Sequence, residues 1–243
     1  MGSVKRAHMV SRSYLRAWAD SRNRVDVLDI EQGRGFTSAI GSATVVSYAY
    51  DPAVLSHDLE REFSGIESNG APAIAKLRHG HQLSRDEMKD MTAFLDMHLE
   101  RGRYADQTGI RTPAVLVKTD GSAEDAQFNL GDRLLLSRYM EGAVRLAALG
   151  VEQWPWEVRE ARSLATGDGA VLLWREKPGA EISVVTFPLS PTQLLVIGTG
   201  YQVQAPLNTL LAEHSRRWIV GTVGSLVKDQ AAVIAGIRRA EPG

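Results

Sequence analysis

The chain has 243 residues and no cysteine, and its 28 basic residues almost balance its 29 acidic residues. Apolar residues make up 44% of the chain, which is typical of a globular protein and sufficient for a sizeable core. The lack of cysteine excludes disulfides, cysteine-based metal sites and a thiol nucleophile. The balanced charge excludes a uniformly basic nucleic-acid coat and an acidic disordered tail.

The N-terminal residues contain no apolar segment of the kind found in a secretory signal. The longest apolar stretches, such as residues 171–174 and 194–197, are far shorter than the roughly 20 residues of a membrane helix. We therefore expect a cytoplasmic protein without a membrane segment.

Basic charge is concentrated at the N-terminus. Residues 1–25 contain six bases and one acid, a net charge of +5, and the rest of the chain has a net charge of −6. Such a segment can bind the phosphates of a nucleic acid or nucleotide. The alternative is that its arginines are solvated or pair with the protein's own carboxylates.

The first half of the chain is predicted to be mainly helical. Ser84 and Glu87 form a capping-box pattern, which begins the clearest helix of the chain, ending near Arg103. Asp51 and Pro52 form another typical helix start. The elements expected in this half are a helix at residues 11–20, strands at 25–30 and 44–50, and helices at 52–63, 66–78 and 85–103.

The second half is predicted to be rich in strands. Residues 107–127 mix Gly, Pro, Thr, Ser and Asp, which favours a linker or mobile loop. After it we expect a helix at 130–149, strands at 157–163, 170–176, 182–187, 193–197 and 218–221, and helices at 206–216 and 225–239. This order predicts an α+β fold, in which a helical N-terminal half packs against an antiparallel, meander-like sheet from the C-terminal half. We expect a single domain over residues 1–243, with a helical part at 1–106, the mobile loop at 107–127 and a sheet-rich part at 128–243.

Common catalytic motifs are missing from the sequence. It contains no dinucleotide-binding glycine motif, no Walker A loop, no nucleophile elbow and no His-Glu-x-x-His zinc motif.

The N-terminal segment carries a family resemblance. The run Ala7-His8-Met9-Val10-Ser11-Arg12-Ser13-Tyr14-Leu15-Arg16-Ala17-Trp18 resembles the opening motif of the domain-of-unknown-function 4238 family, His-His-x-Val-Pro-x-x-Tyr-Leu-Arg-x-Phe. This is a bacterial and phage-associated group. Further similar segments are residues 62–67, 71–74, 80–84, 94–101, 165–170, 186–191 and 207–208. The resemblance implies a fold and a set of residues rather than a reaction.

The chain departs from the family pattern at several positions. Ala7 replaces the first His, Ser11 replaces the Pro, and Gly169-Ala170 replaces an Asn-Pro pair. The loss of the first His puts in doubt any mechanism that needs two imidazoles at this place.

The polar residues of these segments form a candidate site. We expect His8, Tyr14, Glu67 and Asp168 to be catalytic, with the two carboxylates as ligands of Mg²⁺. Arginine forms bidentate hydrogen bonds with phosphate. The expected substrate-binding residues are Arg12, Arg16, Arg101 and Asn208.

These side chains together suit the cleavage of a phosphodiester. The sequence therefore suggests a metal-assisted hydrolase that acts on nucleic acid or nucleotides, with a role in phage defence. One alternative is a module that binds nucleic acid or protein without catalysis. Another is a small-molecule enzyme with an apolar pocket. The same residues would also serve as buried structural partners.

Overall fold

The computed structural model describes residues 4–49, 59–107, 109–137, 145–202, 206–227, 230 and 234. These residues form an α+β fold with six α-helices, one 3₁₀ helix and several antiparallel sheets. The elements in chain order are β1 (Val4–His8), α1 (Arg12–Leu15), β2 (Arg24–Asp29), β3 (Arg34–Ala39), β4 (Val45–Ala49), α2 (Leu59–Arg78), α3 (Arg85–Arg103), β5 (Thr112–Val117), β6 (Ala123–Phe128), α4 (Leu130–Ser137), α5 (Leu146–Leu149), η1 (Val151–Gln153), β7 (Trp156–Glu160), β8 (Thr166–Gly167), β9 (Leu172–Arg175), β10 (Ile182–Ser190), β11 (Gln193–Gly198), α6 (Leu207–His214) and β12 (Trp218–Gly221).

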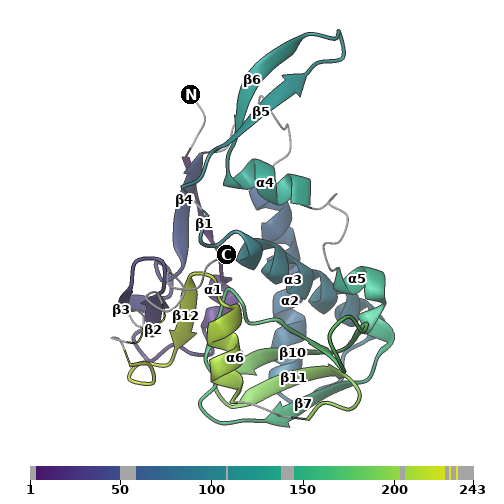
Figure 1. Cartoon of the computed structure of the whole chain (residues 1–243). Helices are drawn as coiled ribbons and strands as arrows, with labels where there is room; N and C mark the ends of the chain where they lie inside the picture. Colours follow the sequence, from purple (N-terminus) through teal and green to yellow (C-terminus); the bar gives the residue numbers. More distant parts are fainter. Residues whose placement is uncertain are drawn as a thin grey trace.

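Two long helices, α2 and α3, form the centre of the molecule (Figure 1). One sheet, with strand order β7-β11-β10-β9, lies at one end of these helices. A second sheet, with the order β3-β2-β12-β8, joins N-terminal strands to C-terminal ones, since β12 pairs with both β2 and β8. Residues far apart in the sequence are thus brought around the same two helices.

Aromatic side chains fill the core between the helices and the first sheet. The rings of Tyr14 and Phe187 stack with their centroids 4.8 Å apart, and Trp18 and Phe94 pack edge-on against Tyr14. The indole N–H of Trp18 donates to the carbonyl oxygen of Leu164 at 2.8 Å. The aromatic positions of the N-terminal family motif are therefore core positions.

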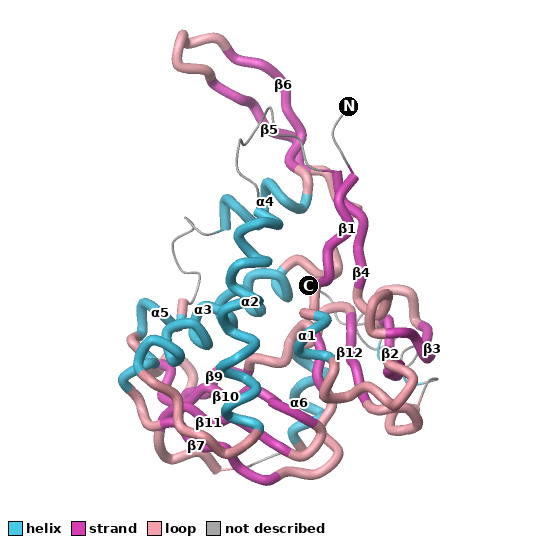
Figure 2. The backbone as a smooth tube through the Cα atoms, turned by 180° about the vertical axis from the view of Figure 1, so that it is seen from behind, coloured by secondary structure: helices cyan, strands magenta, loops and turns pink. Residues whose placement is uncertain are grey.

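The expected division into a helical first half and a sheet-rich second half is not clear in the structure. Strands β1 to β6 all lie in the first 128 residues. Residues 107–127, expected as a mobile loop, contain the hairpin β5–β6, which projects from the body in both views (Figures 1 and 2). Neither strand shows a clear alternation of apolar and polar residues, and the Gly, Pro, Ser and Asp residues of the segment favoured a loop.

Helix boundaries also differ from expectation. Residues 59–78 form one helix with Pro72 inside it, whereas two helices were expected. The helix expected at 11–20 is only four residues long. The helix expected at 130–149 contains α4 and α5, and residues 138–144 lie outside the described part. The expected helix start at 51–58 and most of the expected helix at 225–239 also lie outside it.

Within the part of the chain that the structure describes, no helix is both long and apolar enough to cross a membrane.

Candidate functional site

His8 is the last residue of β1 and is partly exposed. Its Nε2 lies 3.2 Å from the carbonyl oxygen of Gly41. A carbonyl oxygen only accepts hydrogen bonds, so Nε2 carries the hydrogen, and Nδ1 is the basic nitrogen of the neutral ring. Among the described residues, Nδ1 has no hydrogen-bond partner.

Burial lowers the pKa of His8, and the positive charges of Arg101 and Arg12 lower it further. The hydrogen bond to Gly41 and the negative charge of Glu67 act in the opposite direction. At neutral pH the imidazole is therefore mainly uncharged and able to accept a proton at Nδ1.

Glu67 of α2 and Arg101 of α3 form an ion pair with 2.5 Å between Oε1 and Nη1, and the charges of both act on His8. The Arg101 side chain is only 5% exposed, and its guanidinium lies 4.5 Å from the ring centroid of Phe63. Glu67 is more accessible, with 25% of its side chain exposed. The structure therefore places Arg101 as a residue that positions Glu67, whereas the sequence suggested that it binds substrate.

Arg12 and Arg16 lie at the two ends of α1, and both are exposed. The charge of Arg12 acts on His8, so Arg12 lies within electrostatic range of the imidazole. Arg12 is thus an exposed cation whose charge reaches His8.

Tyr14 does not belong to the group around His8, because its side chain is buried in the core. It is 1% exposed, and its hydroxyl donates to the carbonyl oxygen of Pro188 at 2.6 Å and lies 2.7 Å from Oγ1 of Thr166. Burial raises the pKa of Tyr14 far above its ordinary value. The structure thus assigns Tyr14 to the core.

Asp168 also faces the protein's own backbone. Its two carboxylate oxygens accept the N–H groups of Arg216, Arg217 and Trp218 at 2.8, 2.8 and 3.1 Å. Burial raises the pKa of Asp168 to about 7, although the three N–H donors oppose this shift.

The two expected metal ligands have separate partners. Glu67 is bound by Arg101, and Asp168 is bound by backbone N–H groups. No group of three or more His, Cys, Asp or Glu side chains suited to a metal ion occurs among the described residues. The arrangement therefore does not fit the two-carboxylate Mg²⁺ site that the sequence suggested.

Asn208 of α6 connects two segments of the scaffold. Its Oδ1 accepts the N–H of Ala165, and its Nδ2 donates to the carbonyl oxygen of Ser163, both at 2.8 Å. Ser163 has a φ of 52°, an unfavourable conformation for a residue with a side chain. Asn208 thus stabilises this strained turn.

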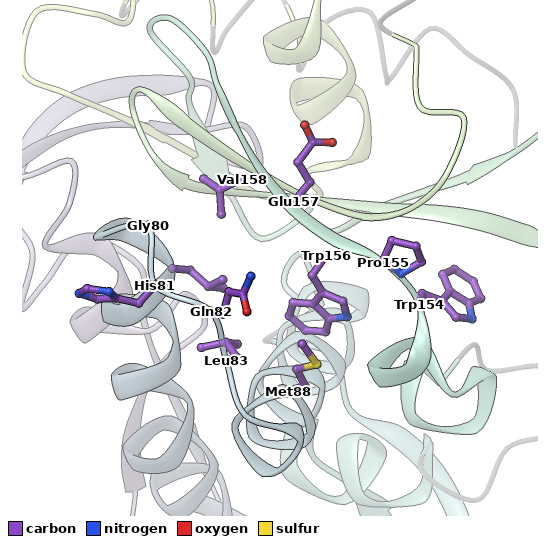
Figure 3. A pocket seen from close by; sticks show the side chains of 11 residues that line it. Gly80, His81, Gln82, Leu83, Met88, Trp154, Pro155, Trp156, Glu157 and Val158 are labelled. Atoms are coloured by element: carbon purple, nitrogen blue, oxygen red, sulfur yellow. The ribbon is translucent and has the colours of Figure 1, made fainter.

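Several hollows in the described part of the chain lie away from His8. One of about 510 Å³ is lined by Trp154, Trp156, Met88 and Gln82, among others (Figure 3). Another, of about 410 Å³, is lined by Asp168 together with three arginines. Sequence reasoning missed both, although the Trp154-Pro155-Trp156 run was a visible signal for the first.

A family model matches residues 6–149, under the description "Protein of unknown function (DUF4238)". The chain belongs to the DUF4238 family. The match confirms the resemblance over this range, and it includes His8, Arg12, Glu67 and Arg101 of the DUF4238 protein. Asp168 and Asn208 lie beyond it. A search of curated proteins and a search of solved structures gave no significant match.

Proposed function

We propose that the DUF4238 protein cleaves phosphodiester bonds in nucleic acid at the site formed by His8, Glu67 and Arg12. One observation carries this proposal. A mainly neutral imidazole, whose Nδ1 has no hydrogen-bond partner in the described part of the chain, lies within electrostatic range of a carboxylate and of an exposed arginine. A base, a carboxylate that stabilises its charged form and a cation for the phosphate are the groups that such a reaction needs.

The favoured substrate is RNA, because its own 2′-hydroxyl is a nucleophile held next to the phosphorus. Nδ1 of His8 accepts the 2′-hydroxyl proton while the 2′-oxygen bonds to phosphorus and the bond to the 5′-oxygen breaks. The leaving 5′-oxygen takes a proton from water, and the imidazolium later returns its proton to solvent. The products are a 2′,3′-cyclic phosphate and a 5′-hydroxyl.

Glu67 and the arginines support this step in different ways. The negative charge of Glu67 stabilises the imidazolium that forms, and Arg101 holds Glu67 in place. Arg12 binds the phosphate as negative charge develops on its oxygens. Arg16 and the other bases of the N-terminal segment attract the nucleic acid over a longer range.

No step of this mechanism passes through a metal ion, because the carboxylates of Glu67 and Asp168 already have protein partners. Assistance by Mg²⁺ remains a separate prediction. The reaction products distinguish it from the mechanism above, because metal-assisted hydrolysis with water leaves no cyclic phosphate. A cytoplasmic location and a role in phage defence also remain proposals. They rest on the type of substrate and on the phage association of the family.

The test uses the full chain and a labelled RNA of mixed sequence, with a matching DNA, in the presence of EDTA or Mg²⁺. We expect RNA cleavage in EDTA, fragments that end in a 2′,3′-cyclic phosphate, and intact DNA. His8→Ala should lower the rate by about 10²–10⁴-fold. His81→Ala removes an exposed histidine outside the site and should have no effect.

Two results would overturn this mechanism. RNA that is bound but never cleaved would show a binding module, whose affinity should fall steeply with salt. Cleavage only with Mg²⁺ would favour metal-assisted hydrolysis.

A further inference from the structure

The cleft of about 410 Å³ gathers positive charge from three separate segments. Arg103 ends α3, Arg175 ends β9, and Arg216 lies between α6 and β12. His214, the last residue of α6, lines the same cleft. Like charges held in one cleft repel one another, so the arrangement calls for a compensating anion.

Among the described residues, no carboxylate compensates the charges of Arg103 and Arg175, whereas Arg216 has a carboxylate partner. Asp168 lines the cleft, but both its oxygens accept backbone N–H groups. Asp106 lies 3.6 Å from Nη1 of Arg216, which is 50% exposed. Arg175 donates to the carbonyl oxygen of Ala180, which is uncharged. No carboxylate of the described residues forms an ion pair with Arg103 or Arg175.

The base of the cleft is tightly packed. A Cβ at Gly169 would lie 2.3 Å from the carbonyl carbon of His214, so the two backbones are in direct contact. The N–H bonds to Asp168 fix the segment that carries Arg216. The cationic groups are therefore attached to a preformed frame.

The wall of the cleft is apolar, since Leu99 of α3 and Leu173 of β9 face it and are only partly buried. A volume of about 410 Å³ is within the range of small-molecule sites. Several guanidinium groups are better suited to binding the doubly charged phosphate of a monoester than to binding a carboxylate, because one arginine is enough to bind a carboxylate.

We infer that this cleft binds a small phosphomonoester of mononucleotide size, with the phosphate among Arg103, Arg175 and Arg216 and the organic part against Leu99 and Leu173. The site is distinct from that at His8. Arg103 is two residues from Arg101, which places the two side chains about 200° apart around α3.

Isothermal titration calorimetry with the full chain tests this inference, using AMP, adenosine, inorganic phosphate and citrate as probes. We expect AMP to bind most tightly, inorganic phosphate more weakly, and adenosine not at all. A 5′-phosphorylated decanucleotide tests whether the phosphate belongs to a nucleic-acid end instead. Tighter binding of this oligonucleotide than of AMP would overturn the assignment.

Arg103→Gln and Arg175→Gln should each weaken AMP binding by about tenfold or more, because each removes a charged hydrogen-bond donor. Arg85→Gln, an exposed arginine at the start of α3, is the control and should bind AMP normally. Arg175 is exposed, so its variant should fold, as circular dichroism will verify.

Unchanged affinity in both cleft variants, or no AMP binding by the natural protein at millimolar concentration, would refute the inference. RNA cleavage at His8 does not enter this experiment, so the two proposals fail separately.

Discussion

Gly102 of α3 lies directly against the backbone of Asp168. A Cβ at position 102 would be 2.1 Å from the carbonyl oxygen of Asp168, a distance that no side chain tolerates. This contact brings the end of α3 onto the turn after β8. It thereby sets both the base of the arginine-lined cleft and the position of the helix that carries Arg101.

Gly102→Ala should destabilise the protein by about 1–3 kcal/mol or more, since the backbone of one segment must move. Gly65→Ala in α2 is the matched control, because a Cβ there meets nothing within 4 Å. It should stabilise the helix by about 0.5–1 kcal/mol. Urea unfolding measures both changes, and equal effects of the two substitutions would contradict the close contact.

Asp168→Asn tests whether this carboxylate is structural. An amide has one accepting oxygen and one NH₂ group, which would face an N–H donor of the 216–218 segment. We expect a loss of unfolding free energy on the order of 2–3 kcal/mol. Since Asp168 is not part of the His8 site, RNA cleavage per folded molecule should not change. Cleavage that is abolished in a variant of normal stability would instead restore the catalytic role suggested by the sequence.

His98 should make stability depend on pH. Its Nε2 lies 2.8 Å from the carbonyl oxygen of Gly167, and burial lowers its pKa to about 4. The unfolded chain, with an imidazole pKa near 6.5, binds the proton more readily. The neutral His98 therefore stabilises the folded state fully above pH 6.5. This stabilisation, up to about 3 kcal/mol of unfolding free energy, is lost as the pH falls towards 4.

The comparison with His98→Gln isolates this effect, because the amide can still donate to Gly167. Asp168 titrates with the opposite sign, since its raised pKa favours the folded state at low pH. We therefore expect the difference in unfolding free energy between the two proteins to change between pH 7 and pH 4.5. A constant difference over this range would show that the histidine does not titrate on unfolding.

Sequence patterns correctly predicted several elements whose ends are set by neighbouring residues, such as helix caps and turns. The capping box at Ser84 correctly places the start of α3, since both of its hydrogen bonds form. Most of the strands from residue 156 onwards were also anticipated, because their apolar runs are separated by clear turns. Strand β1 was missed because its residues carry charges and its pairing with β4 is a contact over about 40 residues.

The candidate site could be predicted only in part for a similar reason. The segments similar to the family led to His8, Arg12, Glu67 and Arg101, whose charges the fold brings within range of one another through β1, α1, α2 and α3. Spacing in the sequence could not show that Tyr14 and Asp168 have buried partners more than 45 residues away. It also could not show that Arg103, Arg175 and Arg216 share one cleft.

Tyr14→Phe tests whether the Tyr14 hydroxyl stabilises the core or takes part in the reaction at His8. It removes a hydroxyl with two buried partners and leaves the carbonyl oxygen of Pro188 without its donor. We expect a destabilisation of about 1–3 kcal/mol, measured by urea unfolding. Below the unfolding transition, RNA cleavage should match that of the natural protein. A large loss of cleavage with unchanged stability would show that the hydroxyl takes part in the reaction.

The pH profile of RNA cleavage tests the role of His8 directly. A general base must be unprotonated, so the rate should rise with pH through the His8 pKa, below 6.5, and level off near neutral pH. Glu67→Gln removes the negative charge that raises this pKa, so the rising limb should move to lower pH. The plateau rate should also fall, because the imidazolium loses its stabilising charge. Arg16→Gln, which removes an exposed positive charge, should leave the rising limb at the same pH. A rising limb that stays at the same pH in Glu67→Gln would show that the carboxylate does not act through the imidazole. A rate that falls with pH across this range would make His8 a general acid rather than a general base.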